Sequence, residues 1–538
     1  MDQAAPTPLI GYDVVVIGAG VNGAGIARDA ALRGYRVCLL EASDIGSGTS
    51  AASSRLIHGG IRYLEHGELR LVRESLRERE LLLRNAPHLV EPFGLLIPFY
   101  RHNGRTPMTL RAGMLAYDLL SADKTTPWHR LIGRAGKPRW PGLAEEGWQG
   151  GALYYDAQAR FAERIAVEIA LSAAEAGATV LTYTPVIGFT RSGNQVTGVR
   201  VRQPGRAEAE IGGRVVINAA GPWVDLVLGT DGIGPRLIGG TKGSHVVVDP
   251  FPGAPSTGVH YEAKSDGRAV LVLPWGGRYL IGSTDLYHEG DPGEVVCTDE
   301  EVDYLLGETN ALIRGAGLVP DDVLFSYSGV RPLPYTPAAG NEANVSRDHA
   351  FVSHGPGHQG LISITGGKLT TWRSLAEQGV DLISRRLGGK RRCVTRQLPL
   401  PGARCADWPA FAEQLRLRSP YSARTTEHLL AVYGVRATEV LALAADDHRL
   451  AKVLPGEDEP LAAEFVFAFG NELARTLTDA LARRTMVGLD GAAGLDTALA
   501  AAEVCGEVLG WSDERIAQEI EAYHRFAQRL RPRALRNG

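Results

Sequence analysis

The clearest chemical signal in the sequence is a glycine-rich turn that directly follows a short β-branched run. Gly18, Gly20 and Gly23 have the spacing GxGxxG, and a helix is expected to begin near Asn22. Gly18 permits a tight turn, Gly20 lets a pyrophosphate approach the backbone, and Gly23 lets the helix pack against the strand. The unpaired N–H groups at the start of that helix favour an anion. Glu41 lies 21 residues past Gly20 (41 − 20), where its carboxylate can accept hydrogen bonds from an adenosine ribose, so the pattern predicts a dinucleotide site.

Two further stretches favour FAD over NAD as that dinucleotide. Residues 46–62 (GSGTSAASSRLIHGGIR) are small and hydroxyl-rich, which suits a backbone pressed against a long extended cofactor. The second stretch, Gly366-Gly367-Lys368, is a turn that opens a late helix. A helix N-terminus beside a flavin would stabilise the negative charge of the reduced ring. An NAD enzyme has no need for a cofactor contact so late in the chain.

Several charged side chains lie beside glycines, as side chains that face a ligand often do. His58 precedes Gly59-Gly60, Arg331 follows Ser-Gly-Val, and Lys368 follows Gly366-Gly367. Taken singly, each of the two cations is more often a partner in a surface salt bridge. The adjoining glycines favour the alternative that these side chains line a pocket.

Hydrophobic periodicity predicts the elements that must position these residues. A strand over 13–17, a helix over 22–33 and a strand over 36–40 form a βαβ unit. A helix is expected over 68–85, and a period of two between 178 and 201 indicates strands with a turn at Ser192-Gly193-Asn194. The remaining expectations are buried strands within 214–221, 243–285 and 324–330, a helix over 301–314, a strand and turn over 361–368, and a helix over 369–387.

These elements predict an α/β protein with three parts. The first is a discontinuous, Rossmann-like FAD-binding domain, the second is a substrate-binding domain with a mixed sheet, and the third contains only helices. After the Pro and Gly residues of LPLPGA (398–403) the chain becomes rich in Ala and Leu with helical spacing. The expected ranges are 11–90, 151–240 and 325–395 for FAD binding, 91–150 and 241–324 for substrate binding, and 400–538 for the helical domain.

Length and composition exclude several classes of protein. A chain of 538 residues needs two or three domains. Its formal net charge of −4 gives no global electrostatic case for binding nucleic acid, so local Arg and Lys residues must gather any anionic ligand. Five scattered cysteines without a CxxC pair favour reduced thiols, and we predict neither a disulfide framework nor a metal site. Because there is no signal-peptide pattern and no run of about 20 apolar residues, we expect a cytoplasmic chain without a membrane-spanning helix.

Seven stretches spread over nearly the whole chain match the motifs of one enzyme family. They are TSAASSRLIHGGIRYLEHGELRLV (49–72), NAAGPWVD (218–225), KGSHVVV (242–248), YSGVRPL (327–333), SRDH (346–349), GGKLTTWR (366–373) and ELARTLTDALARRT (472–485). Together they resemble the FAD-dependent, aerobic-type glycerol-3-phosphate dehydrogenase family, within the D-amino-acid-oxidase-like flavoproteins. The resemblance implies a FAD-binding domain of the D-amino-acid-oxidase and glutathione-reductase type.

The resemblance also implies that FAD is held without a covalent bond. The residues expected to contact it are Gly18, Gly20, Asn22, Gly23, Glu41, Thr49, Ser50, Ser53, Ser54, His58, Gly60, Ala220, Gly221, Trp223, Gly367, Lys368, Leu369 and Thr370.

The implied substrate is sn-glycerol 3-phosphate, a small dianion that needs fixed cations around it. The resemblance places Arg62, Arg331, Arg347 and Lys368 around this substrate, with Tyr63 as a further contact. Arg suits phosphate because its planar fork bonds two oxygens at once. Lys368 is expected to stay protonated and to offset negative charge on the alkoxide or on the reduced flavin.

Oxidation of the secondary alcohol to dihydroxyacetone phosphate removes a proton from the hydroxyl and a hydride from C2, which passes to flavin N5. The proton acceptor should have a pKa near the working pH, which favours a neutral histidine. His58 is the first candidate and His245 is the second. The alternatives are a structural histidine at the glycine turn for His58, and a residue that only lines the pocket for His245. Arg331 and Lys368 complete the expected catalytic set.

The resemblance favours a dehydrogenase that passes electrons to a membrane quinone through peripheral contact with lipid on the inner face of the cell membrane. The alternative is an oxidase that uses O₂ and releases H₂O₂. Its branch tends to carry an insertion between SGVRP and GGK, whereas Arg331 and Lys368 are only 37 residues apart here (368 − 331). An amino-acid oxidase would need one dominant carboxylate-binding Arg, and a flavin-binding subunit without turnover would not need His58. A homodimer and a lipid contact through the basic residues between 525 and 536 stay open, and no role is assigned to residues 101–150.

Overall fold

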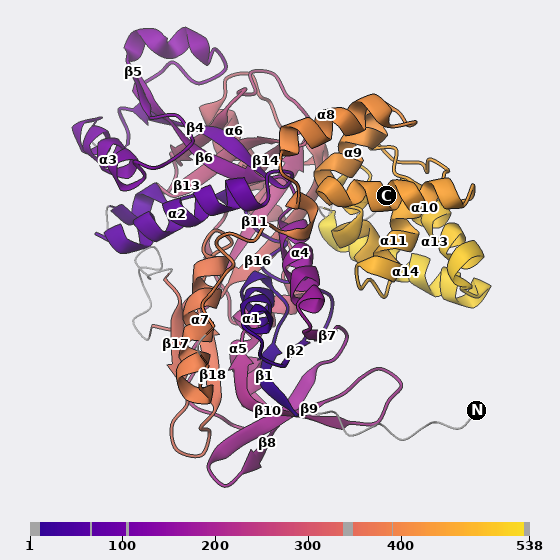
Figure 1. Ribbon diagram of the computed structural model, residues 1–538. Coiled ribbons are helices and arrows are strands. Elements are labelled where there is room, and N and C mark those ends of the chain that lie inside the picture. Colours follow the sequence, from indigo (N-terminus) through magenta and orange to yellow (C-terminus); the bar gives the residue numbers. More distant parts are fainter. Residues whose placement is uncertain (1–10, 65–66, 104–106, 337–347, 390, 532–538) are drawn as a thin grey trace.

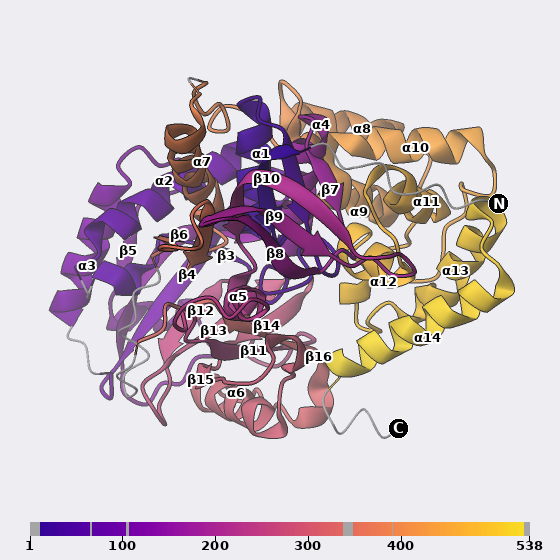
Figure 2. The same ribbon diagram turned by 90° about the horizontal axis from the view of Figure 1, so that it is seen from below.

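The structure is a computed structural model that describes residues 11–64, 67–103, 107–336, 348–389 and 391–531. Two β-sheets and a group of C-terminal helices make up the described molecule (Figure 1). The first sheet has eight strands and the second has ten, and the C-terminal helices lie to one side of both (Figure 2). This is the α/β architecture, with a second mixed sheet and a helical C-terminal part, that the sequence predicts.

The first sheet has a parallel core of five strands. β1 (Tyr12–Ile17) lies at its centre, between β10 (Ala209–Asn218) and β2 (Val37–Leu40). β18 (Leu361–Thr365) extends the core beyond β10, and β7 (Thr179–Leu181) extends it beyond β2. Most residues of β1, β2 and β18 are buried, as in a parallel sheet that is covered on both faces. The predicted βαβ unit is confirmed.

Antiparallel strands complete the first sheet. β17 (Ala350–Ser353) pairs with β18 at one edge. β8 (Val186–Ser192) and β9 (Gln195–Val201) form a hairpin, and β9 pairs with the first half of β10. The hairpin turn lies between Ser192 and Gln195, where the sequence predicts it.

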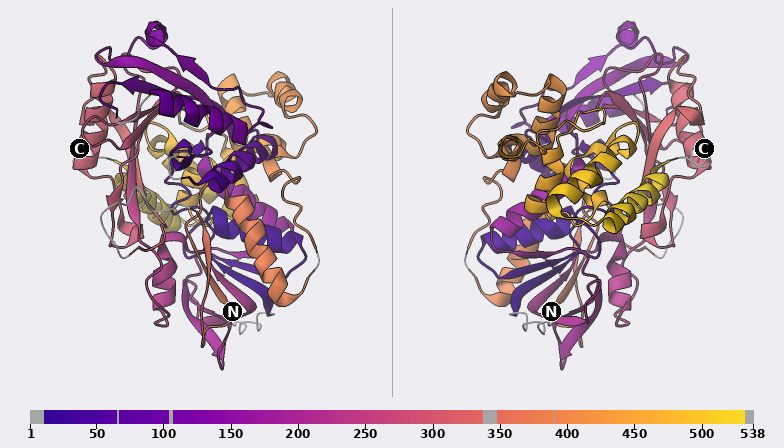
Figure 3. Two further views of the ribbon diagram at one scale, coloured as in Figure 1. Left: turned by 90° about the vertical axis from the view of Figure 1, so that its left-hand side faces the viewer. Right: turned by 90° about the vertical axis from the view of Figure 1, so that its right-hand side faces the viewer.

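Three helices pack side by side on the first sheet. α1 (Val21–Leu32) lies between α4 (Ala162–Glu175) and α7 (Trp372–Leu387), and all three contribute to one buried core with the sheet (Figures 1 and 3). α7 begins three residues later than the predicted start at residue 369, because Lys368 to Thr371 form a turn in which the Thr371 N–H bonds to the Lys368 carbonyl at 3.2 Å.

Two glycines of α1 permit the close packing of this layer. A Cβ on Gly23 would lie 1.9 Å from the carbonyl oxygen of Gly18, so only glycine lets the helix close onto the turn after β1. A Cβ on Gly25 would lie 2.7 Å from Cε3 of Trp372 in α7. The first glycine therefore serves the strand and turn, and the second serves the contact between two helices.

The second sheet is mixed and has ten strands. Their order is β15 (Leu286–Tyr287), β11 (Thr241–Val248), β14 (Arg278–Gly282), β13 (Ala269–Trp275), β12 (Gly258–Glu262), β4 (Val90–Tyr100), β6 (Trp148–Ala159) and β3 (Leu56–Ile57), with β16 (Val323–Arg331) also on β11 and β5 (Arg130–Ile132) also on β6. β12 and β4 are parallel and the other pairs are antiparallel. α6 (Asp299–Leu312) packs on this sheet and shares its core.

The strand pairing does not follow the predicted domain ranges everywhere. β3, β6 and β16 belong to the second sheet, although the sequence assigns their residues, apart from the ends of β6 and β16, to the FAD-binding ranges. These strands pair with residues far away in the chain, which local periodicity cannot indicate. The division into FAD-binding and substrate-binding domains itself stays a prediction.

Three helices not yet described, α2 (Leu69–Asn85), α3 (Pro107–Leu120) and α5 (Val224–Gly229), connect or flank the sheets. α2 matches the helix predicted over 68–85, and α6 matches the one predicted over 301–314 to within two residues. α3 lies in the segment to which the sequence assigns no role, and α5 follows β10.

The C-terminal part contains helices around a core of its own. They are α8 (Trp408–Arg418), α9 (Ala423–Tyr433), α10 (Ala437–Asp446), α11 (Ala462–Asn471), α12 (Leu477–Asp479), α13 (Leu495–Leu509) and α14 (Asp513–Leu530). The continuous stretch Ala423–Asp446 has the length and mean hydropathy of a membrane span, but 61% of its most apolar window is buried within the protein. That burial is typical of a core helix.

Buried ion pairs attach the helical domain to the first sheet. Asp44, which follows β2 and is fully buried, accepts two hydrogen bonds from the Arg484 guanidinium at 2.7 and 2.9 Å and one from Arg483 at 2.5 Å. Burial by itself raises the pKa of Asp44, but the charges and hydrogen bonds of the two arginines outweigh it and hold the pKa at about 2. Asp44 is therefore ionised throughout the physiological range.

A second buried carboxylate strengthens the same junction. Glu472 accepts hydrogen bonds from Arg164 of α4 at 2.5 and 2.9 Å, and from Arg436 at 2.5 Å. Its backbone carbonyl accepts a further bond from Arg484 at 2.7 Å. The stretch ELARTLTDALARRT, which the sequence shows only as a motif, is thus the part of the helical domain that binds the first sheet.

We expect Arg484→Met to destabilise the protein by on the order of 3–5 kcal/mol, because the exchange leaves the buried Asp44 carboxylate short of charge compensation. The control is Arg449→Met, which removes an ion pair with Asp447 that is partly exposed and should cost at most about 1 kcal/mol. Urea denaturation of both variants measures the difference. Because the folded pKa of Asp44 lies below the unfolded value, this stabilisation is present above about pH 4 and is lost as the pH falls towards 2. Equal stability of the two variants would contradict the assignment.

Candidate active site

A large cavity lies where the two sheets and the helical domain meet, and its volume is about 1460 Å³. Its lining brings together most of the predicted site residues. Those in the lining are Gly18, Gly20, Asn22, Glu41, Thr49, Ser50, Ser53, Ser54, His58, Tyr63, Ala220, Gly221, Trp223, His245, Arg331, Gly367, Lys368, Leu369 and Thr370. Gly23 and Gly60 are not among the lining residues. Arg347 and the side chain of Arg62 lie outside the part of the chain that the structure describes.

The glycine-rich turn after β1 presents bare backbone to the cavity. Gly18 has a φ of +97°, and a Cβ there would lie 2.7 Å from the Ala219 carbonyl oxygen, so this position needs glycine. A Cβ on Gly20 would have only the Ser50 hydroxyl within 4 Å, at 3.3 Å. That hydroxyl accepts a hydrogen bond from the Val21 N–H at 3.1 Å. The space above Gly20 is therefore left for a ligand, as a pyrophosphate at a helix N-terminus requires.

Two polar side chains of the cavity fit a dinucleotide. Both carboxylate oxygens of Glu41 accept backbone N–H bonds, from Ala19 at 2.7 Å and from Ser43 at 2.9 Å, which fixes the carboxylate at the end of β2. The Oδ1 atom of Asn22 is buried and has no hydrogen-bond partner among the described residues. Its Nδ2 lies where a Cβ on Gly367 would be only 2.5 Å away, so the late glycine turn meets the first helix. This supports the prediction that the late turn belongs to the nucleotide site.

The hydroxyl-rich segment 47–54 runs against β16 of the second sheet. The Thr49 hydroxyl donates to the Val330 carbonyl at 2.7 Å. A Cβ on Gly329 would lie 2.5 Å from the Cβ of Ala52, so glycine in β16 is needed for this approach. The segment that follows Glu41 in sequence therefore connects the two sheets.

The pairing of β11 with β16 puts two of the candidate catalytic side chains, His245 and Arg331, on one face of the second sheet. Residues that lie directly opposite each other in an antiparallel pair share a face, and alternate residues along each strand do the same. The opposed pairs on this face are Thr241 with Arg331, Gly243 with Gly329, and His245 with Tyr327. A Cβ on Gly243 would lie 2.2 Å from Nη2 of Arg331, so the guanidinium lies over the bare backbone of β11.

Arg331 is held in place by a set of acceptors. Its Nη1 donates to the Asp285 carboxylate at 2.8 Å and to the Thr241 hydroxyl at 3.4 Å. Its Nη2 donates to the Ser283 hydroxyl at 2.8 Å and to the Thr284 carbonyl at 3.2 Å. The cation that the sequence predicts at the substrate is thus oriented by the loop after β14, and its charge is partly balanced by Asp285, a partner that the sequence did not indicate.

His245 is buried and stays uncharged at neutral pH. Its Nε2 lies 2.7 Å from the Ser54 hydroxyl, and its ring stacks on Tyr327 with centroids 5.1 Å apart. Burial, with the nearby charges of Arg331 and Arg55, lowers the pKa of His245 to about 3. Its Nδ1 has no hydrogen-bond partner among the described residues.

The turn around His58 is supported from α3. The His58 N–H donates to the Thr370 hydroxyl at 3.1 Å, which joins this turn to the late glycine turn. The Gly59 N–H donates to the Tyr117 hydroxyl at 2.9 Å, and that hydroxyl donates to the Asp156 carboxylate at 2.8 Å. α3 therefore has a definite role in the site, although its sequence carries no motif that shows it.

Lys368 and Tyr63 are in direct contact. The Lys368 ammonium lies 3.7 Å from the centroid of the Tyr63 ring, a cation–π geometry. Gly60, with a φ of +75°, lets that ring approach, because a Cβ there would lie 2.0 Å from Cε2 of Tyr63. Gly60 thus acts by positioning Tyr63 rather than by lining the cavity.

The helical domain supplies part of the lining that the sequence did not predict. Its lining residues are Thr476, Thr478, Ala482, Arg483, Gly488, Leu489, Gln518, Glu519, Ala522, Arg525, Phe526, Arg529 and Leu530. Arg529 of α14 also donates a hydrogen bond to the Gly293 carbonyl. The available signal was the i, i+4 spacing of Arg525 and Arg529 on one side of a helix, but only the tertiary contacts show that this side faces the cavity.

Known proteins resemble this chain over nearly its whole length. A family model described as FAD dependent oxidoreductase matches residues 13–373, and one described as the C-terminal domain of alpha-glycerophosphate oxidase matches residues 393–516. A glycerol-3-phosphate dehydrogenase of Synechocystis sp. is 41% identical over 536 residues, which is 96% of each chain. A D-erythritol 1-phosphate dehydrogenase of Brucella abortus is 37% identical, over 88% of this chain and 94% of its own. The X-ray structure of the Bacillus halodurans glycerol-3-phosphate dehydrogenase complexed with FAD matches with a TM-score of 0.77 and 26% identity, over 97% of this chain and 95% of that chain.

These matches agree with the geometry of the cavity. The first family model spans the two sheets and all the predicted cofactor contacts, and the second spans most of the helical domain. The open backbone at Gly20, the fixed Glu41 carboxylate and the buried Oδ1 of Asn22 fit the dinucleotide that the family binds. The chain belongs to the glycerol-3-phosphate dehydrogenase family of FAD-dependent oxidoreductases, and FAD is its cofactor.

Proposed function

We propose that the protein oxidises sn-glycerol 3-phosphate at C2 to dihydroxyacetone phosphate. The observation that carries the proposal is the shared lining of one cavity, in which His58, His245, Arg331 and Lys368 lie together with the dinucleotide turn. The relative with 41% identity is named for the same activity.

Residues from three segments would hold the cofactor. They are the turn at Gly18 and Gly20 with Glu41, the hydroxyl-rich segment 47–54, and the late turn at Gly367. FAD, when bound, supplies N5 as the acceptor of the hydride from C2. The protein therefore has to bind the phosphate, take up the hydroxyl proton and keep C2 in reach of the ring.

Arg331 and Lys368 are suited to the phosphate and to the negative charge that develops on the substrate oxygen. The four acceptors around Arg331 fix the direction of its guanidinium before substrate arrives, so little conformational entropy is lost on binding. The contact of Lys368 with the Tyr63 ring restrains the ammonium in the same way. A preorganised pair of cations favours a dianion over a neutral polyol.

The low pKa of His245 makes its imidazole a weak base at neutral pH, which favours His58 as the acceptor of the hydroxyl proton. His245 is uncharged and has a buried Nδ1 without a partner among the described residues, so a substrate hydroxyl would satisfy that atom. His58 lines the cavity, and its backbone is fixed to Thr370 beside Lys368. The contribution of a positioned general base is roughly 10²–10⁴-fold in rate.

We propose further that the electrons leave for a membrane quinone and that the protein works in the cytoplasm, at the inner face of the cell membrane. Support comes from the curated relatives named above, which are dehydrogenases, and from the short 37-residue spacing between Arg331 and Lys368 (368 − 331). The runner-up is a glycerol-3-phosphate oxidase that reduces O₂ to H₂O₂, and the description of the C-terminal family model names an alpha-glycerophosphate oxidase.

Anaerobic titration with sn-glycerol 3-phosphate tests the reaction directly. We expect the near-ultraviolet and blue absorbance of the bound flavin to bleach, because oxidation of the substrate reduces the ring, and one equivalent of dihydroxyacetone phosphate to appear. A yellow protein whose absorbance does not change would contradict the proposal. D-erythritol 1-phosphate is titrated in parallel, and faster bleaching by it would reassign the substrate.

Arg331→Ala separates substrate binding from cofactor binding in the same experiment. Removal of the guanidinium takes away the cation that would bind the substrate and leaves Asp285 without this ion pair at the site, which costs roughly 2–5 kcal/mol and lowers kcat/KM by roughly 30- to 5000-fold. The variant should stay yellow, and the exposed Arg418→Ala should behave as the unmodified protein does. Loss of colour in Arg331→Ala would place this arginine in the nucleotide site instead.

The electron acceptor is decided by a second measurement on the reduced protein. We expect a short-chain quinone to restore the flavin absorbance at least roughly tenfold faster than air-saturated buffer does, with little H₂O₂ released. Reoxidation by air at the same rate as by quinone, with stoichiometric H₂O₂, would favour the oxidase.

The pH dependence tests the role of His245. Because the pKa of its imidazole lies near 3, His245 is neutral above about pH 4 and adds no acid limb to kcat/KM in the usual range. If it accepts the proton, His245→Gln should lower kcat/KM by a roughly constant factor of 10²–10⁴ between about pH 5.5 and about pH 8. An acid limb in the pH profile of the unmodified protein that disappears in His245→Gln would show that His245 is not neutral in this range. An unchanged kcat/KM in His245→Gln would leave His58 as the base.

A further inference from the structure

The sequence from 101 to 140, here called the basic arm, is more basic than the rest of this protein, and its described residues form a projecting segment (Figure 1). Eight of its residues are Lys or Arg and two are Asp, a net charge of +6 (8 − 2) in a chain whose formal net charge is −4. It connects β4 to β6 and contains α3 and β5. The arm lies at one end of the molecule, away from the helical domain (Figures 1 and 3).

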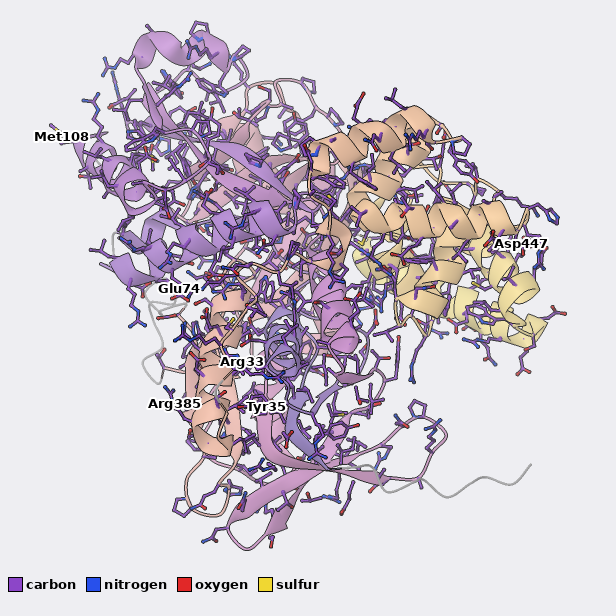
Figure 4. All side chains as sticks on the ribbon, viewed as in Figure 1. Arg33, Tyr35, Glu74, Met108, Arg385 and Asp447 are labelled. Atoms are coloured by element: carbon purple, nitrogen blue, oxygen red, sulfur yellow. The ribbon has the colours of Figure 1, made fainter. Side chains whose placement is uncertain are left out.

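α3 is apolar on two opposite faces, and only one of them is covered by residues that the structure describes. The inner face carries Met114 and Tyr117, which are buried to 0% and 1% exposure. The outer face carries Met108, Leu115 and Leu119, which are 73%, 51% and 60% exposed. Steps of seven and four residues place these three side chains on one stripe of the helix. Figure 4 shows Met108 at the outer margin of the arm.

The arm exposes further large apolar side chains beyond the end of α3. Asp118 folds the chain back, because its carboxylate binds the Lys124 ammonium and also both the backbone N–H and the ring of His129. Two further large apolar side chains, Trp128 at 50% and Leu131 at 43%, are exposed on the returning strand. The Lys124 ammonium lies 5.7 Å from the Trp128 ring. Five large exposed apolar residues thus fall within the 24 positions from 108 to 131 (131 − 108 + 1).

The charge of the arm indicates what covers this apolar surface. The basic arm also carries exposed cations, namely Arg101, Arg111, Arg130, Arg134 and Arg139. A second copy of the chain docked through the same face would bring a charge of +6 against +6, which opposes dimerisation. A segment with an exposed apolar stripe, an exposed Trp and several exposed cations matches the interface of a bilayer with anionic headgroups.

We infer that the basic arm binds the surface of an anionic lipid bilayer, with the outer face of α3 and Trp128 inserted among the headgroups. The basic C-terminal helix α14 is less suited to this, since Arg525 and Arg529 line the cavity and Arg529 bonds to Gly293. The inference deepens the proposed function, because a lipid-bound enzyme meets a quinone that is dissolved in the bilayer. The inner face of the same helix supports the His58 turn through the bond from Gly59 to Tyr117, so the arm joins the bilayer to the site.

Sedimentation of the FAD-loaded protein with lipid vesicles tests the inference. We expect binding to phosphatidylcholine vesicles that contain one third phosphatidylglycerol, weakened by salt, and little binding to phosphatidylcholine alone. The double exchange Leu115→Gln and Leu119→Gln should lower the partition coefficient at least roughly tenfold, because each buried leucine is worth about that factor. Arg130→Glu with Arg134→Glu should lower it by about fivefold or more for each charge.

Leu417→Gln on α8 is the matched control, because Leu417 is 78% exposed but lies in the helical domain. Its binding should equal that of the unmodified protein. Equal partition of the Leu115/Leu119 variant and this control, or equal binding to neutral and anionic vesicles, would overturn the inference. A dimer in light scattering that dissociates in the Leu115/Leu119 variant would also overturn it, since a second copy would then cover the face.

Flavin bleaching by sn-glycerol 3-phosphate in solution separates this inference from the proposed reaction. The arm variants should bleach as the unmodified protein does, because none of the exchanged residues lines the cavity. Vesicle binding without bleaching would leave the arm assignment intact and refute the substrate. Bleaching without vesicle binding would leave the proposed substrate intact and refute the arm assignment.

Discussion

The close approach of the segment after β2 to strand β16 is the contact on which the site depends. It requires Gly329 in β16, since a Cβ there would lie 2.5 Å from the Cβ of Ala52. The Thr49 hydroxyl then reaches the Val330 carbonyl, and the Ser54 hydroxyl reaches the ring of His245. The dinucleotide turn belongs to the first sheet, and the candidate catalytic residues lie largely on the second. Loss of this contact would therefore separate the cofactor site from the candidate catalytic residues.

Two carboxylates of this protein are buried among arginine side chains. Asp44 and Glu472 are buried carboxylates that two or three arginines surround, and they attach the helical domain to the first sheet. One of these arginines, Arg483, also lines the cavity, and its guanidinium bonds to the buried carboxylates of Asp44 and Asp479. Arg331 lies in the same lining, but its partner Asp285 is about one quarter exposed, so an anionic ligand can share the guanidinium of Arg331. Burial, together with the nearby charges of Arg331 and Arg55, lowers the pKa of His245.

Much of the fold could be predicted because its signals are local. The βαβ start, the hairpin at residues 192–195 and the helices α2 and α6 follow from periodicity and turn residues within one short window. The membership of β3, β6 and β16 in the second sheet could not be predicted, because each pairs with strands that are distant in sequence. Among the site residues, those that carry motifs were found. Tyr117, Asp156 and Asp285 were missed, because they act only by hydrogen bonding to motif residues and have no spacing of their own.

The sequence by itself determined the chemistry that is available: a glycine turn for a dinucleotide, the Glu41 carboxylate, two histidines, and cations beside glycines. These are properties of residue type and short spacing, which can be recognised without knowledge of the fold. Only the tertiary structure decided which of these groups share a cavity, that Arg331 is paired, that His245 is neutral, and that one face of α3 has no partner among the described residues. Ion pairing, desolvation and burial depend on the distance between atoms that are far apart along the chain, and that distance is fixed only when the sheets and helices pack.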